Sequence, residues 1–335
     1  MDAGVEMTGR GREQLAPLIW RCLDEMSRER RSLLGCALMR IALGLICLSF
    51  YVLHYGDRWL LYGPEAVWSW RDFQSALGDG GGFSLYEIAA SDAWFTLVFH
   101  VGLLVTLLFI VGWRTRLVVP LHWVLTWSLF QRNPVLLDGG DNLLIIVLAY
   151  LVAVDCGARM SLDADRQPPD LHRDGASVRA VTLLHNAGLL AIVTQVCILY
   201  LTSALYKVQG ELWQNGTALY YIMRVEDFTL PGFSELFYRN ALFVTAGTYA
   251  TVLFQLAFGF LLLNRWTRVL AFTGAVAMHG GIAVLMGLVT FSCVMIAVEV
   301  PLLGDRRLET IGGWLRRGVQ PLRDRVPLRA TVRST

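Results

Sequence analysis

Lys207 is the residue whose type and setting most clearly predict chemistry, because it is the single lysine among 29 Lys and Arg residues. It lies in the motif LYKVQGELWQNG, at the end of a strongly apolar segment. A lysine loses its proton readily when it is removed from water, whereas an arginine stays protonated. Lys207 is therefore our candidate for a catalytic base. Two plainer interpretations stay open: the side chain extends to the membrane interface, or a bias toward arginine codons leaves one lysine by chance.

A polar loop with the sequence QRNPVLLDGGDNLL, residues 131–144, is the second candidate. Its carboxylates and amides suit the N-cap and first turn of a helix, where they satisfy free backbone N–H groups. The alternative is that the loop dips into the mouth of a helix bundle beside Lys207. The candidate binding residues are then those of the loop and two aromatic neighbours of the lysine: Arg132, Asn133, Asp138, Asp141, Asn142, Tyr206 and Trp213.

Ionisable side chains inside apolar segments are further candidates, because a charge within a bilayer is costly. His279 is central to such a segment and is our second candidate catalytic residue. Arg40 and Glu299 are predicted to be structural. We expect Arg40 to pair with a buried acidic group or to reach a lipid phosphate, and Glu299, close to Pro301, to face the headgroups.

The remaining histidines and the cysteines give no sign of a metal site. For His100, His122 and His185 we favour a neutral ring that is hydrogen-bonded to a helix carbonyl. The six cysteines show no CxxC motif and are interpreted as small packing residues. No pair of histidines has metal-ligand spacing, so we expect no metal.

Composition predicts the elements that position these residues. The chain is 55% hydrophobic and 17% charged, whereas soluble domains carry about 25% charged residues. Several apolar runs reach the roughly 18–20 residues that cross a bilayer as a helix. We predict an all-α, polytopic transmembrane bundle of about eight crossings with structured outer loops. The predicted crossings are 32–55, 93–112, 117–131, 142–155, 181–204, 242–263, 268–285 and 287–303. The last two divide one long apolar run at Gly287.

The distribution of arginine predicts the orientation. With the N-terminus in the cytoplasm, the inner segments hold 22 Lys and Arg residues and the outer segments hold 6. Cytoplasmic loops are enriched in these residues, so both ends are expected in the cytoplasm. We divide the chain into an N-terminal arm (1–31), a transmembrane domain (32–303) and an Arg-rich tail (304–335). The expected partner is the lipid bilayer, and no nucleic acid is expected.

Four stretches resemble the HTTM (horizontally transferred transmembrane) superfamily, which includes the membrane domain of vitamin K-dependent γ-glutamyl carboxylase. They are RNPVLLDGGDNLL, ALYKVQGELWQNGTALYY, FGFLLLNRWTRVLAF and MHGGIAVLMGLVTFSCVMIAVEVPLL, and the similarity runs from about Arg40 to Leu303. Among bacterial members the chain looks most like the sporulation-delaying protein B family. That group acts with a small partner protein in maturing a secreted peptide toxin. The resemblance implies a bacterial plasma membrane location.

The resemblance also implies roles for two residues. The carboxylase uses a lysine of this region as the base toward vitamin K hydroquinone, and that lysine directly follows another one. Counted back from Trp213, Lys207 aligns with the first of the pair and Val208 with the base. His279 aligns with a histidine of the carboxylase membrane domain. The implied cofactor is reduced menaquinone or a vitamin K-like quinol, whereas no counterpart of the carboxylase's large lumenal domain is expected.

Three functions therefore compete. The first is maturation of a secreted, toxin-like precursor peptide together with a partner protein. The second is a quinol-dependent carboxylase- or epoxidase-like enzyme, with Lys207 as its base. The third is a scaffold without catalysis that binds lipid or a partner. No inverted repeat or pair of broken helices is evident, so a transporter is less favoured.

Overall fold

The computed structural model describes residues 17, 20–80, 82–164, 175–230 and 232–323, and these residues form helices without any strand. Eight helices coincide with the eight predicted apolar segments. They are α2 (Leu33–Leu53), α5 (Asp92–Val111), α6 (Thr115–Arg132), α7 (Gly139–Leu151), α8 (Ala176–Gln209), α12 (Ala241–Leu261), α13 (Thr267–Met286) and α14 (Val289–Glu299), which continues as the 3-10 turn η5 (Val300–Leu303). The predicted all-α class is confirmed.

The lengths of these helices bear on the number of membrane crossings. Five of them, α2, α5, α8, α12 and α13, are long and apolar enough to cross a membrane within the described chain. Helix α7 and the combined α14–η5 are shorter apolar helices. Helix α6 has 18 residues, with Pro120 inside and Arg132 in its last turn. A multi-pass membrane bundle follows, while eight crossings remain a prediction.

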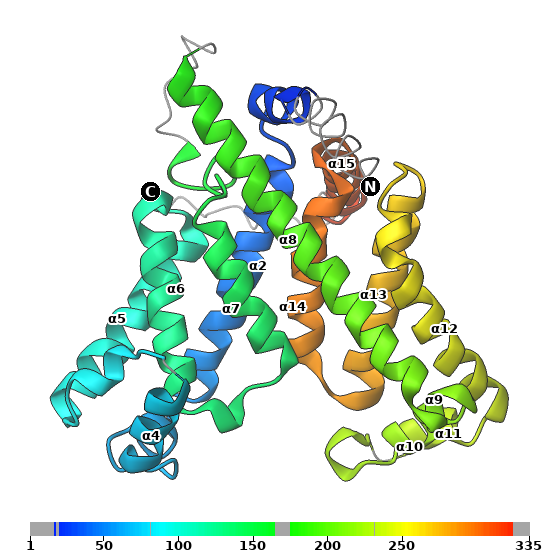
Figure 1. The fold of residues 1–335 in the computed structure, drawn as a ribbon, viewed down its shortest axis with the longest axis horizontal. Helices are drawn as coiled ribbons and strands as arrows, with labels where there is room; N and C mark the ends of the chain where they lie inside the picture. The colour runs from blue at the N-terminus through cyan, green and yellow to red at the C-terminus, as the bar shows by residue number, and fades with distance from the viewer. Residues whose placement is uncertain (1–16, 18–19, 81, 165–174, 231, 324–335) are drawn as a thin grey trace, which may run out of the picture.

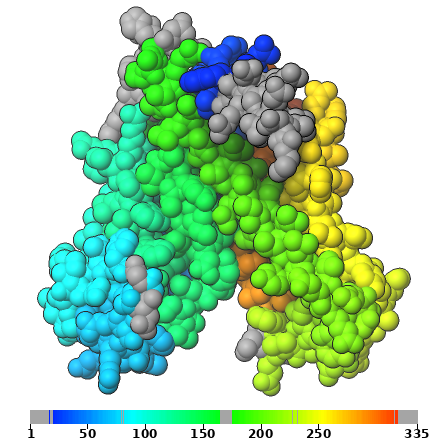
Figure 2. Space-filling model, in the orientation of Figure 1, coloured from blue at the N-terminus to red at the C-terminus, as the bar shows by residue number. Residues whose placement is uncertain are grey.

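The helices form two groups that meet at one end of the molecule (Figure 1). One group contains α5, α6 and α7, the other contains α12 and α13, and the long helix α8 runs diagonally between them (Figure 1). Helix α14 packs on α7, α2, α8 and α13, so it joins the groups. Figure 2 shows the surface hollowed between the groups, with the orange segment of the chain recessed in the hollow.

Short helices gather at the open end, on both sides of the hollow (Figure 1). The loops that were predicted to be structured therefore contain short helices. One loop forms α3 (Arg58–Tyr62), α4 (Trp70–Gly80) and η1 (Leu85–Ile88), and η2 (Pro134–Leu136) precedes α7. The other forms α9 (Glu211–Gln214), α10 (Ala218–Ile222), η4 (Glu226–Phe228) and α11 (Ser234–Tyr238).

The break between α13 and α14 lies where the sequence predicts it. Gly287 follows α13 with φ of 69°, in the left-handed region that favours glycine, and α14 begins two residues later. Because only Gly287 and Leu288 separate the helices, they pack against each other as a tight pair.

The arginine-rich segments meet at the opposite end, as the predicted topology requires. Arg30 forms an ion pair with Asp155, and Arg307 donates to the Arg265 carbonyl at 2.6 Å. Arg159 pairs with Glu309 of helix α15 (Asp305–Arg323) at 2.8 Å. These segments therefore share one end, while its cytoplasmic orientation stays a prediction. The rest of the predicted arm (1–16, 18 and 19) and tail (324–335) lies outside the described residues.

Arg40 holds this end together through backbone groups. Its fully buried guanidinium donates to the carbonyls of Phe109 and Ile110, both at 2.5 Å, of Cys156 at 3.1 Å, and of Met160 at 2.6 Å. These contacts replace the expected bond to a carboxylate or lipid phosphate. The last carbonyls of a helix have no partner within the helix, so a cation there is favourable. Arg40 thus closes the end of α5.

Candidate functional site

A cavity of about 560 Å³ lies inside the second group of helices. Helices α8, α12, α13 and α14 form its walls, and residues of α9 and α10 contribute at the open end of the bundle. Gly281 faces open space on one wall, whereas Gly247 and Gly274 let the side chains of Leu219 and Phe254 pack closely. Most of the lining is apolar, including Met223, Met278, Met286 and Met295. Flexible methionine side chains adapt to irregular ligands, so the cavity suits an apolar molecule with few polar groups.

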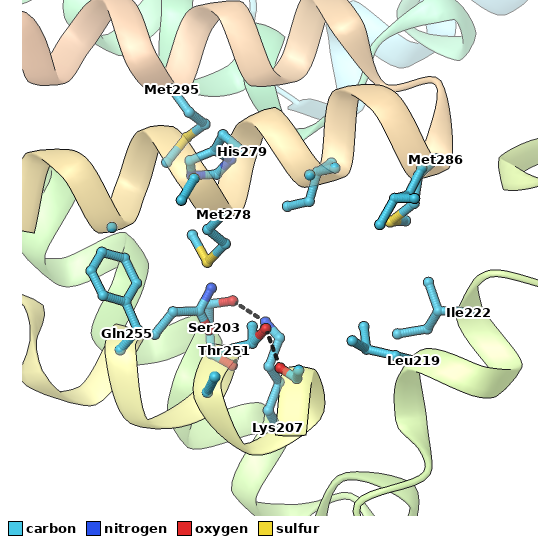
Figure 3. Close-up of a pocket in the computed structure, with 18 of the residues that line it drawn as sticks. Ser203, Lys207, Leu219, Ile222, Thr251, Gln255, Met278, His279, Met286 and Met295 are labelled. Carbon is cyan, nitrogen blue, oxygen red and sulfur yellow. Dashed lines mark hydrogen bonds between the residues drawn. The ribbon is translucent and has the colours of Figure 1, made fainter. Parts of the chain in front are cut away.

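Lys207 lines this cavity near its open end. Helical spacing of four residues places Ser203 beneath it, and Lys207 Nζ donates to Ser203 Oγ at 2.5 Å (Figure 3). The same Nζ lies 5.2 Å from the centre of the Trp213 ring, which supplies a cation–π contact. Among the described residues no carboxylate forms an ion pair with Lys207. The ammonium group is therefore half-buried without a neutralising partner.

His279 lies on the facing wall, on α13 (Figure 3). Its side chain is 2% exposed, and its Nε2 is 2.8 Å from the hydroxyl of Tyr200. The Tyr200 hydroxyl in turn donates to Glu299 Oε1 at 2.5 Å. A hydroxyl has one proton, so Tyr200 then accepts from Nε2–H, which leaves Nδ1 as a bare acceptor. That Nδ1 has no hydrogen-bond partner in the structure.

The position of Glu299 differs from the sequence-based expectation. We expected this carboxylate to face the headgroups because Pro301 follows it closely. Instead it is 0% exposed and faces α8, where Tyr200 is its hydrogen-bond donor. Helix α14 ends at Glu299, but η5 continues the chain through buried Pro301, Leu302 and Leu303. The proline therefore marks a tighter turn inside the protein and not an exit from the membrane.

The hydrogen-bonded cluster Tyr200–His279–Glu299 lies deeper than Lys207. Tyr200 precedes Lys207 by seven residues on α8, which is about 10 Å along a helix axis. Tyr200 was not predicted as a site residue. The available signal was weak: a tyrosine in the middle of an apolar segment normally needs a hydrogen-bond partner, but its partner is 99 residues further along the chain.

The polar loop before α7 does not line the cavity. Arg132 donates to the carbonyls of Gly63 and, at 2.9 Å, of Trp68, and Asn133 donates to the Leu61 carbonyl at 2.9 Å. Both side chains are buried. They fix the segment that carries α3 and α4 to the end of α6.

Asp138 and Asp141 form the helix cap that the plainer interpretation predicts. Asp138 accepts hydrogen bonds from the Gly140 and Asp141 amides at 2.6 and 3.2 Å, while Asp141 accepts from the Asp138 amide at 2.9 Å. Asn142 is exposed. Gly140 packs on Phe291, whose ring lines the cavity 5.6 Å from that of His279. The loop therefore supports the cavity wall from behind.

Of the two aromatic candidates, Trp213 and Tyr206, only Trp213 lies in the cavity wall. Trp213 lines the cavity and contacts Lys207, as described above. Tyr206 is 79% exposed and is absent from the lining. Successive residues of a helix point in different directions, so Lys207 faces the cavity while its neighbour faces the surroundings of the bundle.

His100, His122 and His185, the other histidines interpreted from the sequence, have local hydrogen bonds. His100 Nδ1 is 2.8 Å from the Thr96 carbonyl, and His185 Nε2 is 2.8 Å from the Arg31 carbonyl. His122 stacks on Phe109 at 4.3 Å, with Thr106 and Thr126 at 3.4 and 3.5 Å from Nδ1. The expected helix-carbonyl partner is thus present for His100, whereas the carbonyl that His185 contacts lies in the non-helical segment before α2.

Comparison with known proteins shows which family this helix bundle belongs to. The sequence matches the HTTM domain over residues 81–304, more than half of the chain. The chain belongs to the HTTM family. The matched HTTM region includes every residue that lines the cavity.

Two curated proteins of Bacillus subtilis (strain 168) are similar to this HTTM protein. The uncharacterized protein YitO is 26% identical over 202 residues, which cover 58% of this chain and 63% of YitO. The sporulation-delaying protein SdpB is 25% identical over 168 residues, which cover 48% of this chain and 49% of SdpB. The similarity thus spans about half to two thirds of these relatives. No solved structure matches the chain.

The cavity of this HTTM protein fits the quinol implied by the resemblance better than it fits a metal. Two unpaired, buried polar atoms belong to lining residues, His279 Nδ1 and Gln255 Oε1. Both accept hydrogen bonds in these positions, so they suit a ring that carries hydroxyl groups. Within the described chain, no cluster of three His, Cys, Asp or Glu side chains is arranged to hold a metal ion.

Proposed function

We propose that this multi-pass HTTM protein matures a secreted, toxin-like peptide together with a small partner protein, in a bacterial plasma membrane. One observation carries the proposal: Lys207 and His279 line a single apolar cavity at the end of the bundle that bears α9, α10 and α11. With both chain ends in the cytoplasm, this end faces outward. A peptide leaving the cell then meets the cavity beside short helices that offer a docking surface.

The relationship to SdpB supports this function. SdpB is named as a sporulation-delaying protein, and this chain is 25% identical to it over 49% of its length. We transfer a role in peptide production on that basis and assign it to the cavity. The partner protein supplies what the cavity lacks, which is a surface long enough to hold a precursor.

Quinol-dependent chemistry is the second candidate, favoured by the unpaired acceptors in the cavity. A bound quinol would supply reducing equivalents and acidic hydroxyl protons. His279 Nδ1 and Gln255 Oε1 would hold such hydroxyl groups, and Lys207 in its neutral form would remove a proton from one of them. Ser203 orients the amine through its 2.5 Å contact. The apolar walls exclude water, and removal from water favours the neutral amine over the charged ammonium form.

The test is production of the mature peptide in cells that carry Lys207→Met or Lys207→Arg. A base is lost in both variants, so both should abolish the mature peptide, as measured by mass spectrometry of the medium. A purely electrostatic role predicts recovery in Lys207→Arg. Arg239→Met, directly after α11, is the matched control, because it removes one exposed charge at the same end of the bundle.

Two outcomes would count against the proposal. Unchanged peptide mass and activity after deletion of the whole gene would exclude a role in maturation. Normal peptide from both Lys207 variants, combined with loss on deleting residues 211–238, would favour a scaffold. Turnover of menahydroquinone by purified protein, lost in Lys207→Met, separates the quinol enzyme from the other two functions.

A further inference from the structure

A second cavity, of about 580 Å³, lies at the opposite end of the bundle from Lys207. It is bordered by α8, α12, the chain that precedes α2, and the η5 turn. The proposed function does not use this cavity. It combines an apolar wall with two arginines at one end, Arg31 and Arg268.

Hydrogen bonds from α8 build this cavity. Asn186 Nδ2 donates to the carbonyls of Met26 and Glu29 at 2.7 and 2.8 Å, and the Arg31 amide donates to Asn186 Oδ1 at 3.1 Å. His185 also contacts the Arg31 carbonyl. These bonds hold the chain before α2 against α8. Arg31 is thereby placed on the rim by a buried amide and not by a flexible loop.

Both arginines retain donors for an anion. The Arg31 side chain is exposed and forms no ion pair with a described residue. Arg268 uses Nε and Nη2 to contact the Leu262 carbonyl, at 3.4 and 3.0 Å, which fixes the guanidinium and leaves Nη1 available. Two guanidinium groups on one cavity favour a phosphate group, with which arginine forms strong charge-assisted bonds.

Nearby carboxylates are engaged elsewhere. Asp305 accepts from the amides of Leu33, Leu34 and Gly35, the first residues of α2, at 2.9 to 3.3 Å. Asp155 is paired with Arg30. These acids therefore neutralise a helix end and a different arginine, so the positive charge of Arg31 and Arg268 is not cancelled.

The wall below the arginines is apolar and has the length of an acyl segment. Leu189, Val193 and Cys197 line the cavity at intervals of four on α8, and the eight helical steps from Leu189 to Cys197 span about 12 Å. Gly259 faces it from α12, where a Cβ would come within 3.9 Å of Cys197 Sγ. Leu262 and Leu263 complete that side.

We propose that this cavity binds an anionic phospholipid, with the phosphate at Arg31 and Arg268 and an acyl chain between α8 and α12. Charge complementarity defines the headgroup, and the apolar wall distinguishes a lipid from a free anion. Basic cavities between membrane helices are suited to such headgroups. The bound lipid would contact both α8 and α12 at this end of the bundle. At the other end the two helices are linked along the chain by the short helices α9, α10 and α11.

The test is thermal unfolding of the purified full chain in neutral detergent, with phosphatidylglycerol, phosphatidylcholine or inorganic phosphate added. Only phosphatidylglycerol should raise the unfolding temperature. Arg31→Gln/Arg268→Gln should weaken its apparent affinity about tenfold or more, because each basic contact contributes to headgroup binding. Arg114→Gln/Arg116→Gln is the control, since it removes two arginines at the same end but outside this cavity.

A second variant tests the acyl contact without a change of charge. Val193→Trp fills the wall and should reduce lipid retention, as measured by native mass spectrometry, while leaving binding in the Lys207 cavity unchanged. Equal stabilisation by inorganic phosphate would assign the cavity to a free anion. An equal response in the Arg114/Arg116 control, or none in the unmodified chain, overturns the proposal.

Discussion

Tyr200 connects two titratable side chains that come from distant parts of the chain. It contacts His279, 79 residues away, and Glu299, 99 residues away. All three are buried within the bundle. Each alone is a polar group in an apolar environment, which is unfavourable unless it is hydrogen-bonded. Together they satisfy one another, except at His279 Nδ1, which belongs to a cavity-lining residue, and at Glu299 Oε2, which is buried without a partner.

Tyr200→Phe should therefore destabilise the protein more than a loss of packing explains. It leaves His279 Nε2 and Glu299 Oε1 buried without partners, at a cost of about 1–3 kcal/mol for each orphaned group. The measurement is a double-mutant cycle of Tyr200→Phe and Glu299→Gln in detergent, followed by thermal unfolding. We expect a coupling of about 1 kcal/mol or more.

Tyr150→Phe is the matched control, since Tyr150 packs against the core as a partly buried residue without a described side-chain hydrogen bond. Additive effects of Tyr200→Phe and Glu299→Gln would contradict the cluster. The same variants are expected to lower peptide production, because His279 loses the contact that fixes its ring.

At the scale of elements, Gly287 sets the turn that divides the long apolar run into α13 and α14. No atom lies within 4 Å of the position that a Cβ would occupy, so only backbone strain opposes a side chain there. Gly287→Ala should lower the free energy of unfolding by about 1–2 kcal/mol, the penalty of a left-handed conformation. Thermal or denaturant unfolding measures it.

Gly280→Ala provides an internal comparison for this element. Gly280 is equally free of neighbours within 4 Å but lies inside α13 with an ordinary helical backbone. The same added methyl should there stabilise the helix by about 0.5–1 kcal/mol. Opposite signs for the two variants would confirm the turn, whereas equal effects would show that α13 continues through Gly287.

Much of the arrangement of elements follows from local sequence. Apolar segment length predicts all eight helices, and Gly287 predicts the break, because both are properties of neighbouring residues. The predicted crossing at 181–204 omits the first five and the last five residues of α8, because these end segments include polar and charged residues. The sequence also identified Lys207 and His279 as candidates for a catalytic site. It could not place Tyr200 or Glu299 there, because their contact depends on how α8 and α14 pack.

At the scale of the whole molecule, the two ends of the bundle carry different chemistry. The Lys207 cavity lies at the end with the short aromatic helices, and the arginine-bordered cavity lies at the other. In the proposed orientation the first faces outward, toward an exported peptide. The second then faces the cytoplasmic leaflet, where anionic lipids and arginine-rich segments attract each other.

The number of membrane crossings decides whether the two cavities face opposite sides of the membrane. Helix α7 has 13 residues, or about 20 Å at 1.5 Å per residue, against a hydrocarbon core of about 30 Å. Alkaline phosphatase fused after Gly216, Gly287 or Gly304 reports the side of each fusion point. Eight crossings predict activity after Gly216 and Gly287 and none after Gly304, because five, seven and eight spans then precede these points. Activity after Gly304 would indicate an odd number of crossings and would exclude eight.

These fusions give the same result whether α6 and α7 both cross the membrane or both stay on one side of it. The loop between α6 and α7 therefore needs its own probe. Val135 is 68% exposed in that loop. In Val135→Cys, a membrane-impermeant maleimide added to intact cells should label the new thiol above the background of the parent chain. Labelling only after the membrane is opened would place the loop on the inner side or within the bilayer. The Arg132 contacts to Gly63 and Trp68 would then hold α3 and α4 inside as well, and the outward position of the open end would be excluded.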